Sequence, residues 1–481
     1  MSKAANKSKR IVRNLQDLSG WLEAGSTPKH NLVIGSEHEK LLLKESNQRA
    51  ASFNGKKGIE KLLEKLQDKG WAAVTENGRI IELTRDNANV SLEPSGQMEH
   101  STPIYSQLHQ VANEIDRQID EVVEVGRELG IDCIGLGYHP VQNYQNLPRI
   151  PKSRYKSYEK HMREMDGPEK KAMQMLYASA STQVNMGFIN EQDMVKKLRV
   201  SLALQPIVSA LCANSPFKNG KPSGYQSTRS HVVHNAVNGR YGFMLPVAFE
   251  KDFGFERYAE YALNEMPLMG VYKNGYFKGT HDAKFSDLMA GELDVCPGKK
   301  ATMNDWENHL NCIWPEVRLR QFLEMRGADS GPVEMIKALP ALWIGLMYDD
   351  AMLDHAYEMV RHWSAEDREY LREQTPVTGL QTPFLGGTVQ DVALNVLALS
   401  DQGLNNRNIL DDHGRNEAQY LEPMHEIANS GLNWADRLIQ KYNTEWKQDI
   451  AKVFNEMSYR QAPSVLSSPS AAQRIPPKPG P

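Results

Sequence analysis

The chain has 481 residues, enough to bury one large core or two to three cores of ordinary size. Its apolar content of 40% and charged content of 24% are typical of a soluble globular protein. A formal charge of −4 and the lack of a bilayer-length apolar run exclude no fold. They do lead us to expect neither a nucleic-acid partner nor a membrane partner.

Both ends of the chain differ in composition from its body. Residues 1–13 are basic and lack the apolar stretch of a secretory signal, and residues 461–481 are rich in proline and serine. We expect both segments to be disordered, because they have too little apolar surface to offset the entropy of ordering. Four widely spaced cysteines form no CxxC pair and indicate free thiols in a reducing cytoplasm.

The first half of the chain mixes short strands with long helices. Apolar residues at helical spacing predict helices at 14–24, 58–69, 104–129, 170–178 and 190–204, with Pro206 interrupting the last one. Runs rich in β-branched residues predict strands at 32–43, 72–75, 79–83, 90–93, 131–137 and 182–186. Residues 214–230 are rich in Gly, Pro and Ser and predict a long binding loop.

The second half is mostly helical. Helices are predicted at 255–263, 306–312, 338–347, 350–362, 364–372, 389–399 and 417–442, and one strand is predicted at 317–326. Strands that come early and helices that come late favour an α+β fold with a largely antiparallel sheet over alternating βαβ units.

The stretch GSEHEK at 35–40 lies between two apolar runs and is predicted to be part of a buried strand. Side chains two apart on a strand point the same way, so Glu37 and Glu39 share one face. Two buried like charges repel each other unless a cation neutralises them, and Mg²⁺ or Mn²⁺ prefers carboxylate oxygens. The alternative is an edge strand whose two glutamates face water.

Three other predicted strands carry polar groups at alternate positions. Those groups are Glu93, Gln97 and Glu99; Gln183 and Asn185; and Glu324 and Arg326. Four such strands indicate a sheet with one packed face and one face that forms a polar cavity. Carboxylates and arginines in one cavity suit phosphoryl chemistry on a nucleotide. The alternative is an exposed sheet face with salt-bridged ladders.

Familiar catalytic motifs are missing from the sequence. It has no GxxxxGK[ST] phosphate loop, no GxGxxG that opens a helix after a strand, no HExxH and no GxSxG. His38 lies on the face opposite Glu37 and Glu39, and we expect it to be structural.

Eight segments together resemble the glutamate–cysteine ligase family of the plant and proteobacterial type, over residues from about 14 to about 445. They are GSEHEK at 35–40, SLEPSGQ at 91–97, QVN at 183–185, ALQPI at 203–207, ANSPF at 213–217, DWENHL at 305–310, LEMRGAD at 323–329 and ALPALW at 338–343. The resemblance implies a single catalytic domain over 14–460 with a glutamine-synthetase-like α+β fold. In that fold an antiparallel sheet curves around an active-site funnel, with helices outside.

The same resemblance implies the reaction and its participants. The γ-carboxylate of L-glutamate is joined to the amine of L-cysteine through γ-glutamyl phosphate, with ATP as cosubstrate and Mg²⁺ or Mn²⁺ as cofactor. This is the first step of glutathione biosynthesis and an ADP-forming carbon–nitrogen ligation. We expect a cytoplasmic monomer or homodimer.

The family's motifs also imply the site residues. Metal ligands would be Glu37, Glu39, Glu93, Glu99 and Glu324. Arg326, with Glu324, would act at the transferred phosphate. Arg154, Arg229, Gln183 and Asn185 would hold the glutamate substrate.

Three alternative functions stay open at this point. One is a related carboxylate–amine ligase that uses another amine, since the sequence defines the glutamate end better than the amine end. Another is a non-catalytic homologue that binds glutamate or nucleotide, although it would not need all the metal and phosphate groups. A metal-dependent hydrolase is the third, and it lacks the histidine ligands common in such sites.

Overall fold

The computed structural model describes residues 8–165, 170–236, 241–273, 276–280 and 283–461. Most of the two segments predicted to be disordered therefore lies outside the described residues. The described part of the N-terminal segment is paired rather than disordered. Ile11 forms a β-bridge with Thr302, and the amide of Val12 donates to the carbonyl of Ala301. Burial of the Val12 side chain supplies the apolar contact that composition alone did not predict.

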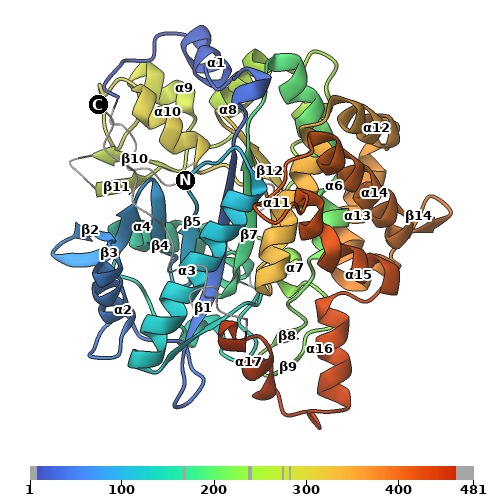
Figure 1. The fold of residues 1–481 in the computed structure, drawn as a ribbon. Helices are drawn as coiled ribbons and strands as arrows, with labels where there is room; N and C mark the ends of the chain where they lie inside the picture. The colour runs from blue at the N-terminus through green and yellow to red at the C-terminus, as the bar shows by residue number, and fades with distance from the viewer. Residues whose placement is uncertain (1–7, 166–169, 237–240, 274–275, 281–282, 462–481) are drawn as a thin grey trace, which may run out of the picture.

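One open nine-stranded sheet organises the molecule (Figure 1). Its strands are β1 (Ile34–Lys44), β2 (Ala72–Glu76), β3 (Arg79–Arg85), β4 (Ala88–Leu92), β5 (Met98–Ser101), β6 (Ile131–Ile134), β7 (Ser181–Met186), β12 (Val317–Leu319) and β13 (Leu323–Asp329). They run in the order β12-β13-β7-β1-β5-β4-β3-β2, with β6 paired to the far end of β1, and every pair is antiparallel. The predicted antiparallel α+β class is confirmed.

Three two-stranded hairpins lie outside this sheet. They are β8 (Phe217–Lys218) with β9 (Lys221–Pro222), β10 (Gly270–Lys273) with β11 (Tyr276–Gly279), and β14 (Pro383–Phe384) with β15 (Gly387–Thr388). The first of them lies inside the predicted loop 214–230, so that segment is partly structured.

Helices make up most of the remaining chain. The α-helices are α1 (Leu15–Glu23), α2 (Ile59–Leu66), α3 (Leu108–Leu129), α4 (Ser153–Met165), α5 (Lys171–Ala178), α6 (Glu191–Leu211), α7 (Thr228–His234), α8 (Phe255–Asn264), α9 (Phe285–Ala290), α10 (Met303–Leu310), α11 (Val333–Met347), α12 (Asp350–Val360), α13 (Ala365–Thr378), α14 (Val389–Arg407), α15 (Glu422–Ser430), α16 (Trp434–Asn443) and α17 (Lys452–Glu456). Short 3₁₀ turns are η1 (Lys29–Asn31), η2 (Gln67–Lys69), η3 (Tyr144–Asn146), η4 (Pro246–Phe249), η5 (Gly379–Gln381), η6 (Glu417–Leu421) and η7 (Tyr459–Gln461). Within the described residues, no helix is both long and apolar enough to cross a membrane.

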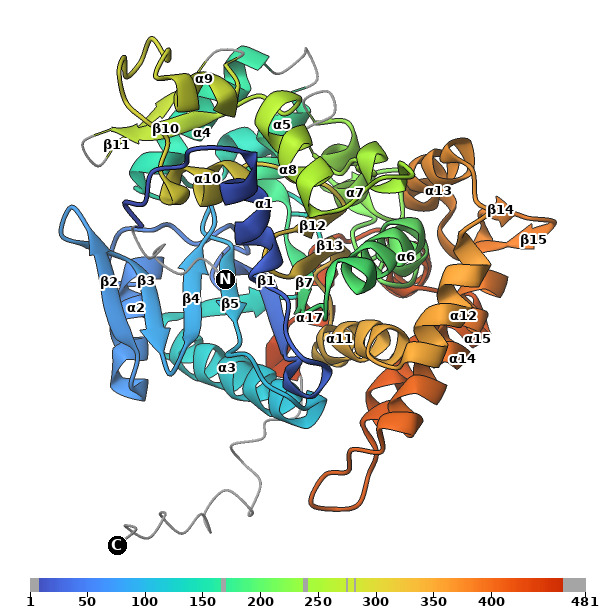
Figure 2. The same ribbon diagram turned by 90° about the horizontal axis from the view of Figure 1, so that it is seen from above.

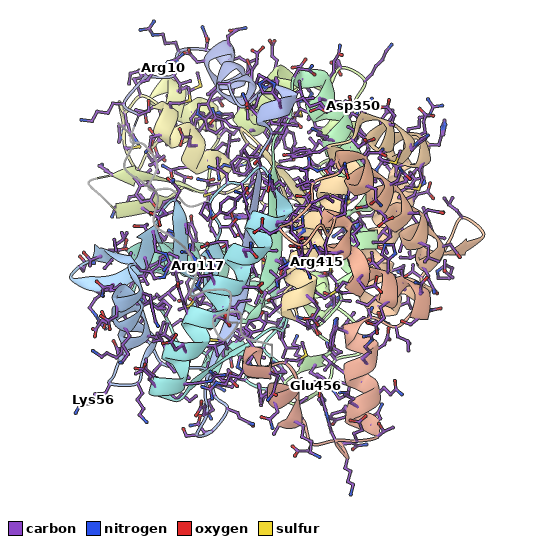
Figure 3. All side chains as sticks on the ribbon, viewed as in Figure 1. Arg10, Lys56, Arg117, Asp350, Arg415 and Glu456 are labelled. Carbon is purple, nitrogen blue, oxygen red and sulfur yellow. The ribbon has the colours of Figure 1, made fainter. Side chains whose placement is uncertain are left out.

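Helices lie on both sides of the sheet. Figure 2 shows α3 and α11 along one side, and α5 and α7 on the other. The predicted apolar stripe of α3, which includes Val111, Ile115, Ile119 and Val122, is buried in the main core. Charged side chains such as Lys56, Asp350 and Arg415 are exposed to solvent, and Lys56 lies at the edge of the molecule in Figure 3.

The face of β1 opposite Glu37 and Glu39 is packed, and its polar groups are paired there. His38 Nε2 lies 3.3 Å from Gln118 Oε1, and the ring of His38 stacks on that of His100. Lys40 hydrogen-bonds to His100 Nδ1. Burial lowers the pKa of Lys40 to about 7 and the pKa of His38 well below its ordinary value. The predicted structural role of His38 is confirmed.

Several predicted boundaries are wrong; the predicted helix 417–442, for example, is divided into η6, α15 and α16. The helix from Asn190 does not stop before Pro206 but continues to Leu211, because residues 200–211 are buried and their packing offsets the missing backbone hydrogen bond. The predicted strand 317–326 is a hairpin of β12 and β13, in which Arg318 faces Glu324. The turn between them allows these opposite charges to pair across the two strands.

Two glycines allow α11 and α14 to pack closely. A Cβ added at Gly403 would lie 1.9 Å from the carbonyl oxygen of Gly345. We expect Gly403→Ala to lower the free energy of unfolding by about 1–3 kcal/mol, because the two helices must move apart. Chemical denaturation measures the change.

Gly20→Ala is the matched control, since Gly20 lies inside α1 and a methyl group placed on it would meet no neighbouring atom within 4 Å. This substitution should raise the free energy of unfolding by about 0.5–1 kcal/mol through helix propensity. Equal effects of the two substitutions would contradict the close contact between α11 and α14.

Candidate active site

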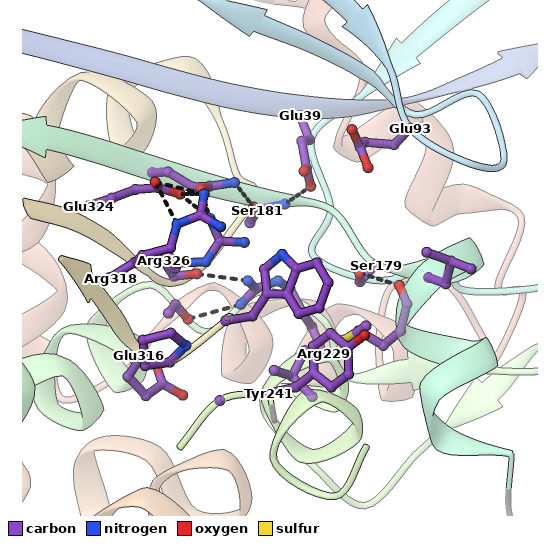
Figure 4. A pocket seen from close by; sticks show the side chains of 18 of the residues that line it. Glu39, Glu93, Ser179, Ser181, Arg229, Tyr241, Glu316, Arg318, Glu324 and Arg326 are labelled. Atoms are coloured by element: carbon purple, nitrogen blue, oxygen red, sulfur yellow. Dashed lines mark hydrogen bonds and ion pairs between the residues drawn. The ribbon is translucent and has the colours of Figure 1, made fainter. Parts of the chain in front are cut away.

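A cavity of about 270 Å³ opens on the polar face of the sheet. It is lined by 29 residues from β1, β5, β7, β12, β13, α4, α5, α7 and the loops between them. Figure 4 shows Glu39 and Glu93 at one side of the cavity and Arg318, Glu324 and Arg326 at the other. The predicted polar cavity is therefore present, and the sheet face is not simply exposed to water.

Nine of the ten predicted site residues line this cavity. They are Glu37, Glu39, Glu93, Glu99, Arg154, Gln183, Arg229, Glu324 and Arg326. The tenth, Asn185, lies behind the lining, and its side-chain amide donates to Glu37 Oε1 at 2.8 Å. Asn185 is thus placed to orient a carboxylate of the site.

Strand register brings the carboxylates on the first side together. Glu39 of β1 lies directly opposite Glu99 of β5, and Glu99 accepts a hydrogen bond of 2.8 Å from Ser91 of β4. Burial raises the pKa of Glu39 to about 7, and the charge of Glu93 adds to this effect. Burial, with Glu37, Glu93 and Glu39 nearby, raises the pKa of Glu99 well above its ordinary value. These carboxylates are close enough to resist ionising together.

Glu324 has the opposite electrostatic environment. It is buried, which by itself would raise its pKa, yet the guanidinium groups of Arg318 and Arg326 hold that pKa well below the usual range. Arg318 donates twice at 2.8 Å and once at 3.0 Å to the carboxylate, and Arg326 also hydrogen-bonds to it. Arg326 donates in addition to Gln183 Oε1 at 2.7 Å. A permanently charged cluster therefore faces the carboxylates across the cavity.

The two arginines assigned to substrate come from outside the sheet. Arg229 lies on α7, and its guanidinium donates to the carbonyl oxygens of Arg326 at 2.8 Å and Gly327 at 3.0 Å. Arg154 lies at the start of α4 and donates to the hydroxyl of Tyr155 at 3.2 Å. That hydroxyl donates to the carbonyl of Leu92 at 2.6 Å, next to Glu93.

Several lining residues were not among the sequence-predicted site residues. Arg318 and Arg320 have the same strand parity as Glu324, and that parity could have identified them. His234 Nε2 lies 2.6 Å from Glu316 Oε1, and the rings of Tyr241 and Trp314 stack 4.7 Å apart. These four residues come from α7 and irregular segments, where no periodic signal marks them.

The structure also tests whether the carboxylates suit a metal. Within the described part of the chain, no three His, Cys, Asp or Glu side chains are gathered closely enough to hold an ion between them. Mg²⁺, however, is usually bound by one or two carboxylates together with substrate phosphates and water, not by a protein cage. Burial and neighbouring carboxylates raise the pKa of Glu39 and that of Glu99, so this donor set fits a hard cation.

The α+β fold of the chain is shared with solved structures. Its structure is similar to the crystal structure of glutamate–cysteine ligase from Francisella tularensis in complex with AMP, with a TM-score of 0.56, 12% sequence identity and 92% of each chain covered. It is also similar to a bifunctional glutathione synthetase from Pasteurella multocida, with a TM-score of 0.51, 11% identity, and coverage of 93% of this chain and 54% of that one. At these identities the likeness shows a shared fold.

Sequence comparison identifies the family. The model of glutamate–cysteine ligase family 2 matches residues 33–456. Glutamate–cysteine ligase B of Oryza sativa subsp. japonica is 41% identical over 92% of this chain and 87% of its own length. The Arabidopsis thaliana enzyme is 39% identical over 92% of this chain and 83% of its own length. The chain belongs to the glutamate–cysteine ligase family, whose reaction is the ATP-dependent formation of γ-glutamylcysteine, the first step of glutathione synthesis.

The predicted cytoplasmic localisation is contradicted by these relatives. The rice, Medicago truncatula and Arabidopsis enzymes are all named chloroplastic. The prediction rested on unpaired cysteines, and all four are indeed free and buried. Cysteine pairing separates oxidising from reducing surroundings and does not define one particular reducing compartment.

The raised pKa of Glu39 makes a testable contribution to stability. Its ordinary pKa of 4.5 rises to about 7 on folding, so the folded chain binds more protons than the unfolded chain between these values. Folding stability due to this group therefore falls as pH rises from 4.5 to 7, and is constant above. In the presence of a chelator, we expect Glu39→Gln to match the parent near pH 4.5 and to exceed its free energy of unfolding by about 1–3 kcal/mol at pH 8.

Urea denaturation at several pH values measures this difference. Glu60→Gln is the control, because Arg79 bonds to Glu60 and lowers its pKa, so this variant should gain nothing as pH rises. If the free energies of unfolding of Glu39→Gln and the parent differ by the same amount at every pH, Glu39 ionises normally.

Proposed function

We propose that the cavity on the polar sheet face is the ligase active site and that its two sides have different tasks. The carboxylates of β1, β5 and the β4–β5 loop serve the metal and the nucleotide phosphates. The arginines of β13, α7 and α4 serve the transferred phosphate and the glutamate substrate. The observation that carries this proposal is the separation of acidic and basic groups across one cavity in a member of the ligase family.

For the metal side, we propose Glu37, Glu39, Glu93, Glu99 and Glu324 as candidate ligands of Mg²⁺ or Mn²⁺. A hard cation would neutralise the clustered carboxylates and draw charge from the phosphates of ATP. Glu324 has a second task, because its bonds to Arg318 and Arg326 fix the direction of both guanidinium groups. The metal would therefore compete with arginines only at this one carboxylate.

For the phosphate side, we propose that Arg326 meets the γ-phosphate as it moves to the glutamate carboxylate. A carboxylate is a poor acyl donor because its leaving group would be oxide, and phosphorylation replaces that leaving group with phosphate. Phosphoryl transfer needs alignment and charge neutralisation more than covalent help from the protein. A guanidinium held by Glu324 and Gln183 is pre-oriented for this charge before the substrate arrives.

For the substrate side, we propose that Arg154 and Arg229 bind the carboxylate of glutamate, with Gln183 beside them and Asn185 acting through Glu37. Planar guanidinium groups match a carboxylate with two parallel hydrogen bonds. The cysteine amine then attacks the acyl carbon of γ-glutamyl phosphate. The bond between this carbon and the phosphate oxygen breaks, and the amine loses its proton. Phosphate leaves with the electron pair of the broken bond.

We further propose that residues 14–460 act as one catalytic domain. The main apolar cluster contains residues from Val12 to Tyr459, which supports a single body without an internal boundary. A monomer or homodimer stays our prediction for the assembly.

The metal assignment predicts the behaviour of Glu37→Gln and Glu39→Gln. Each change removes one anion with little change in volume, so we expect kcat to fall by about a hundredfold or more and the Mg²⁺ concentration for half-maximal rate to rise. A coupled assay of ADP release at varied Mg²⁺ measures both. Glu60→Gln on α2 is the control, and it should leave both quantities unchanged. Full turnover by both active-site variants at unchanged Mg²⁺ dependence would refute the metal assignment.

The substrate assignment predicts that Arg229→Lys raises the KM for glutamate by about tenfold or more, and the KM for cysteine by less than about threefold. Lysine keeps the charge but loses the two-pronged geometry. Steady-state kinetics with each substrate varied in turn measure the effect. Arg257→Lys, on a surface ion-pair network of α8, should change neither constant. An effect on the cysteine KM alone would place Arg229 in the other substrate's pocket.

A further inference from the structure

Arg229 is fixed to a β-bulge in the strand that carries Arg326. Between Met325 and Ala328 the register of β13 with β7 shifts, so that Arg326 and Gly327 lie outside the regular ladder. Their carbonyl oxygens both accept hydrogen bonds from the Arg229 guanidinium. The bulge thus supplies two acceptors that a regular strand would use for its own ladder.

A buried carboxylate lies just beyond the bulge. Asp329 is 4% exposed, and its Oδ1 is 3.9 Å from the Arg229 guanidinium. Its Oδ2 accepts from the backbone amide of Asn214 at 3.0 Å and the hydroxyl of Ser215 at 2.6 Å. Its Oδ1 accepts from the hydroxyl of Ser227 at 2.8 Å.

The same two hydroxyls hold the start of the helix that carries Arg229. Ser227 is the N-cap of α7, where its Oγ accepts from the amide of Ser230 at 3.0 Å. Ser215 Oγ accepts from the amide of Arg229 itself at 3.2 Å. Asp329 therefore bonds to the two serines that hold the backbone around Arg229, and it also faces the Arg229 guanidinium.

Close packing keeps Asp329 in this position. A Cβ placed on Gly137 would lie 2.4 Å from the carboxyl carbon of Asp329, so the backbone at Gly137 fits directly against the side chain. Asp329 does not line the cavity, and a substrate bound there would not touch it. Any influence of Asp329 on the reaction must therefore pass through the residues that it contacts, among which Arg229 has the charge that a carboxylate substrate requires.

We propose that Asp329 is a positioning residue that orients Arg229 for the carboxylate of glutamate. It anchors both serines that hold the N-terminus of α7, and its negative charge faces the guanidinium from behind. The opposite side of the guanidinium is thereby left to the substrate. This inference rests on the proposed role of Arg229 in binding glutamate, and adds the residue that sets its geometry.

The test is Asp329→Asn, which keeps the shape and removes the charge. We expect the KM for glutamate to rise about tenfold, while kcat and the KM for ATP change by less than about threefold. A purely structural defect would lower the amount of active enzyme, and hence kcat, without this selective rise. Ser227→Ala, which removes one donor to Asp329, should raise the glutamate KM in the same direction by a smaller factor.

Glu417→Gln is the matched control. Glu417 is another fully buried carboxylate, which accepts from the amide of Leu108 and pairs with Arg407 at 3.3 Å, and it does not line the cavity. This variant should lose stability to a comparable degree and keep its glutamate KM. A rise in glutamate KM in Glu417→Gln equal to that in Asp329→Asn would overturn the proposal.

A double-mutant cycle separates this proposal from the role of Arg229. If Arg229→Lys raises the glutamate KM and Asp329→Asn adds little to it, the two residues act as a unit and the proposal holds. If the two effects multiply, or if Asp329→Asn leaves the glutamate KM unchanged, Asp329 does not position Arg229. If Arg229→Lys itself leaves the glutamate KM unchanged, the proposed function of Arg229 fails. Should Asp329→Asn not fold, Ser227→Ala decides by the same criteria.

Discussion

Repulsion between carboxylates on one face of the sheet is the constraint on which the site depends. Glu39 and Glu99 face each other across β1 and β5, where burial and neighbouring charge raise the pKa of both. Glu324, on the far side of β7, escapes this effect because Arg318 and Arg326 bond to it. The sheet therefore carries an acidic zone and a compensated basic zone, and the cavity lies between them. Under the proposed function, a nucleotide with a cation and a substrate with carboxylates would supply complementary charges for the two zones.

The packed face makes this charge separation possible. Side chains alternate along β1, so the residues between the glutamates point into the core. There Lys40 and His100 bond to each other, and burial lowers the pKa of both. A lysine whose pKa is about 7 carries much less positive charge than an exposed one. Lys40 therefore offsets little of the charge of Glu39 and Glu99 on the other face.

Strand parity predicted much of this site from the sequence, because the period of two in a strand is independent of the rest of the fold. It correctly grouped Glu37 with Glu39 and placed His38 on the other face. It could not predict that residues 317–326 fold back as a hairpin, since the pairing of Arg318 with Glu324 arises only after the turn forms. Nor could it predict the pair of His234 and Glu316, which meet through tertiary packing of α7 against the segment before β12.

The bulge in β13 connects Arg229, the arginine proposed for the substrate, with Arg326, the arginine proposed for the phosphate. In a regular antiparallel strand the carbonyls of neighbouring residues point to opposite sides, so those of Arg326 and Gly327 could not both hold Arg229. Gly327 is needed at this point, because a Cβ there would lie 2.4 Å from Glu316 Oε2 and 2.6 Å from Gln205 Nε2. One backbone irregularity thus holds the guanidinium proposed for the substrate next to the one proposed for the phosphate. Because Arg326 is itself a bulge residue and Arg229 bonds to the carbonyls of both bulge residues, a shift of the bulge would displace both guanidinium groups at once.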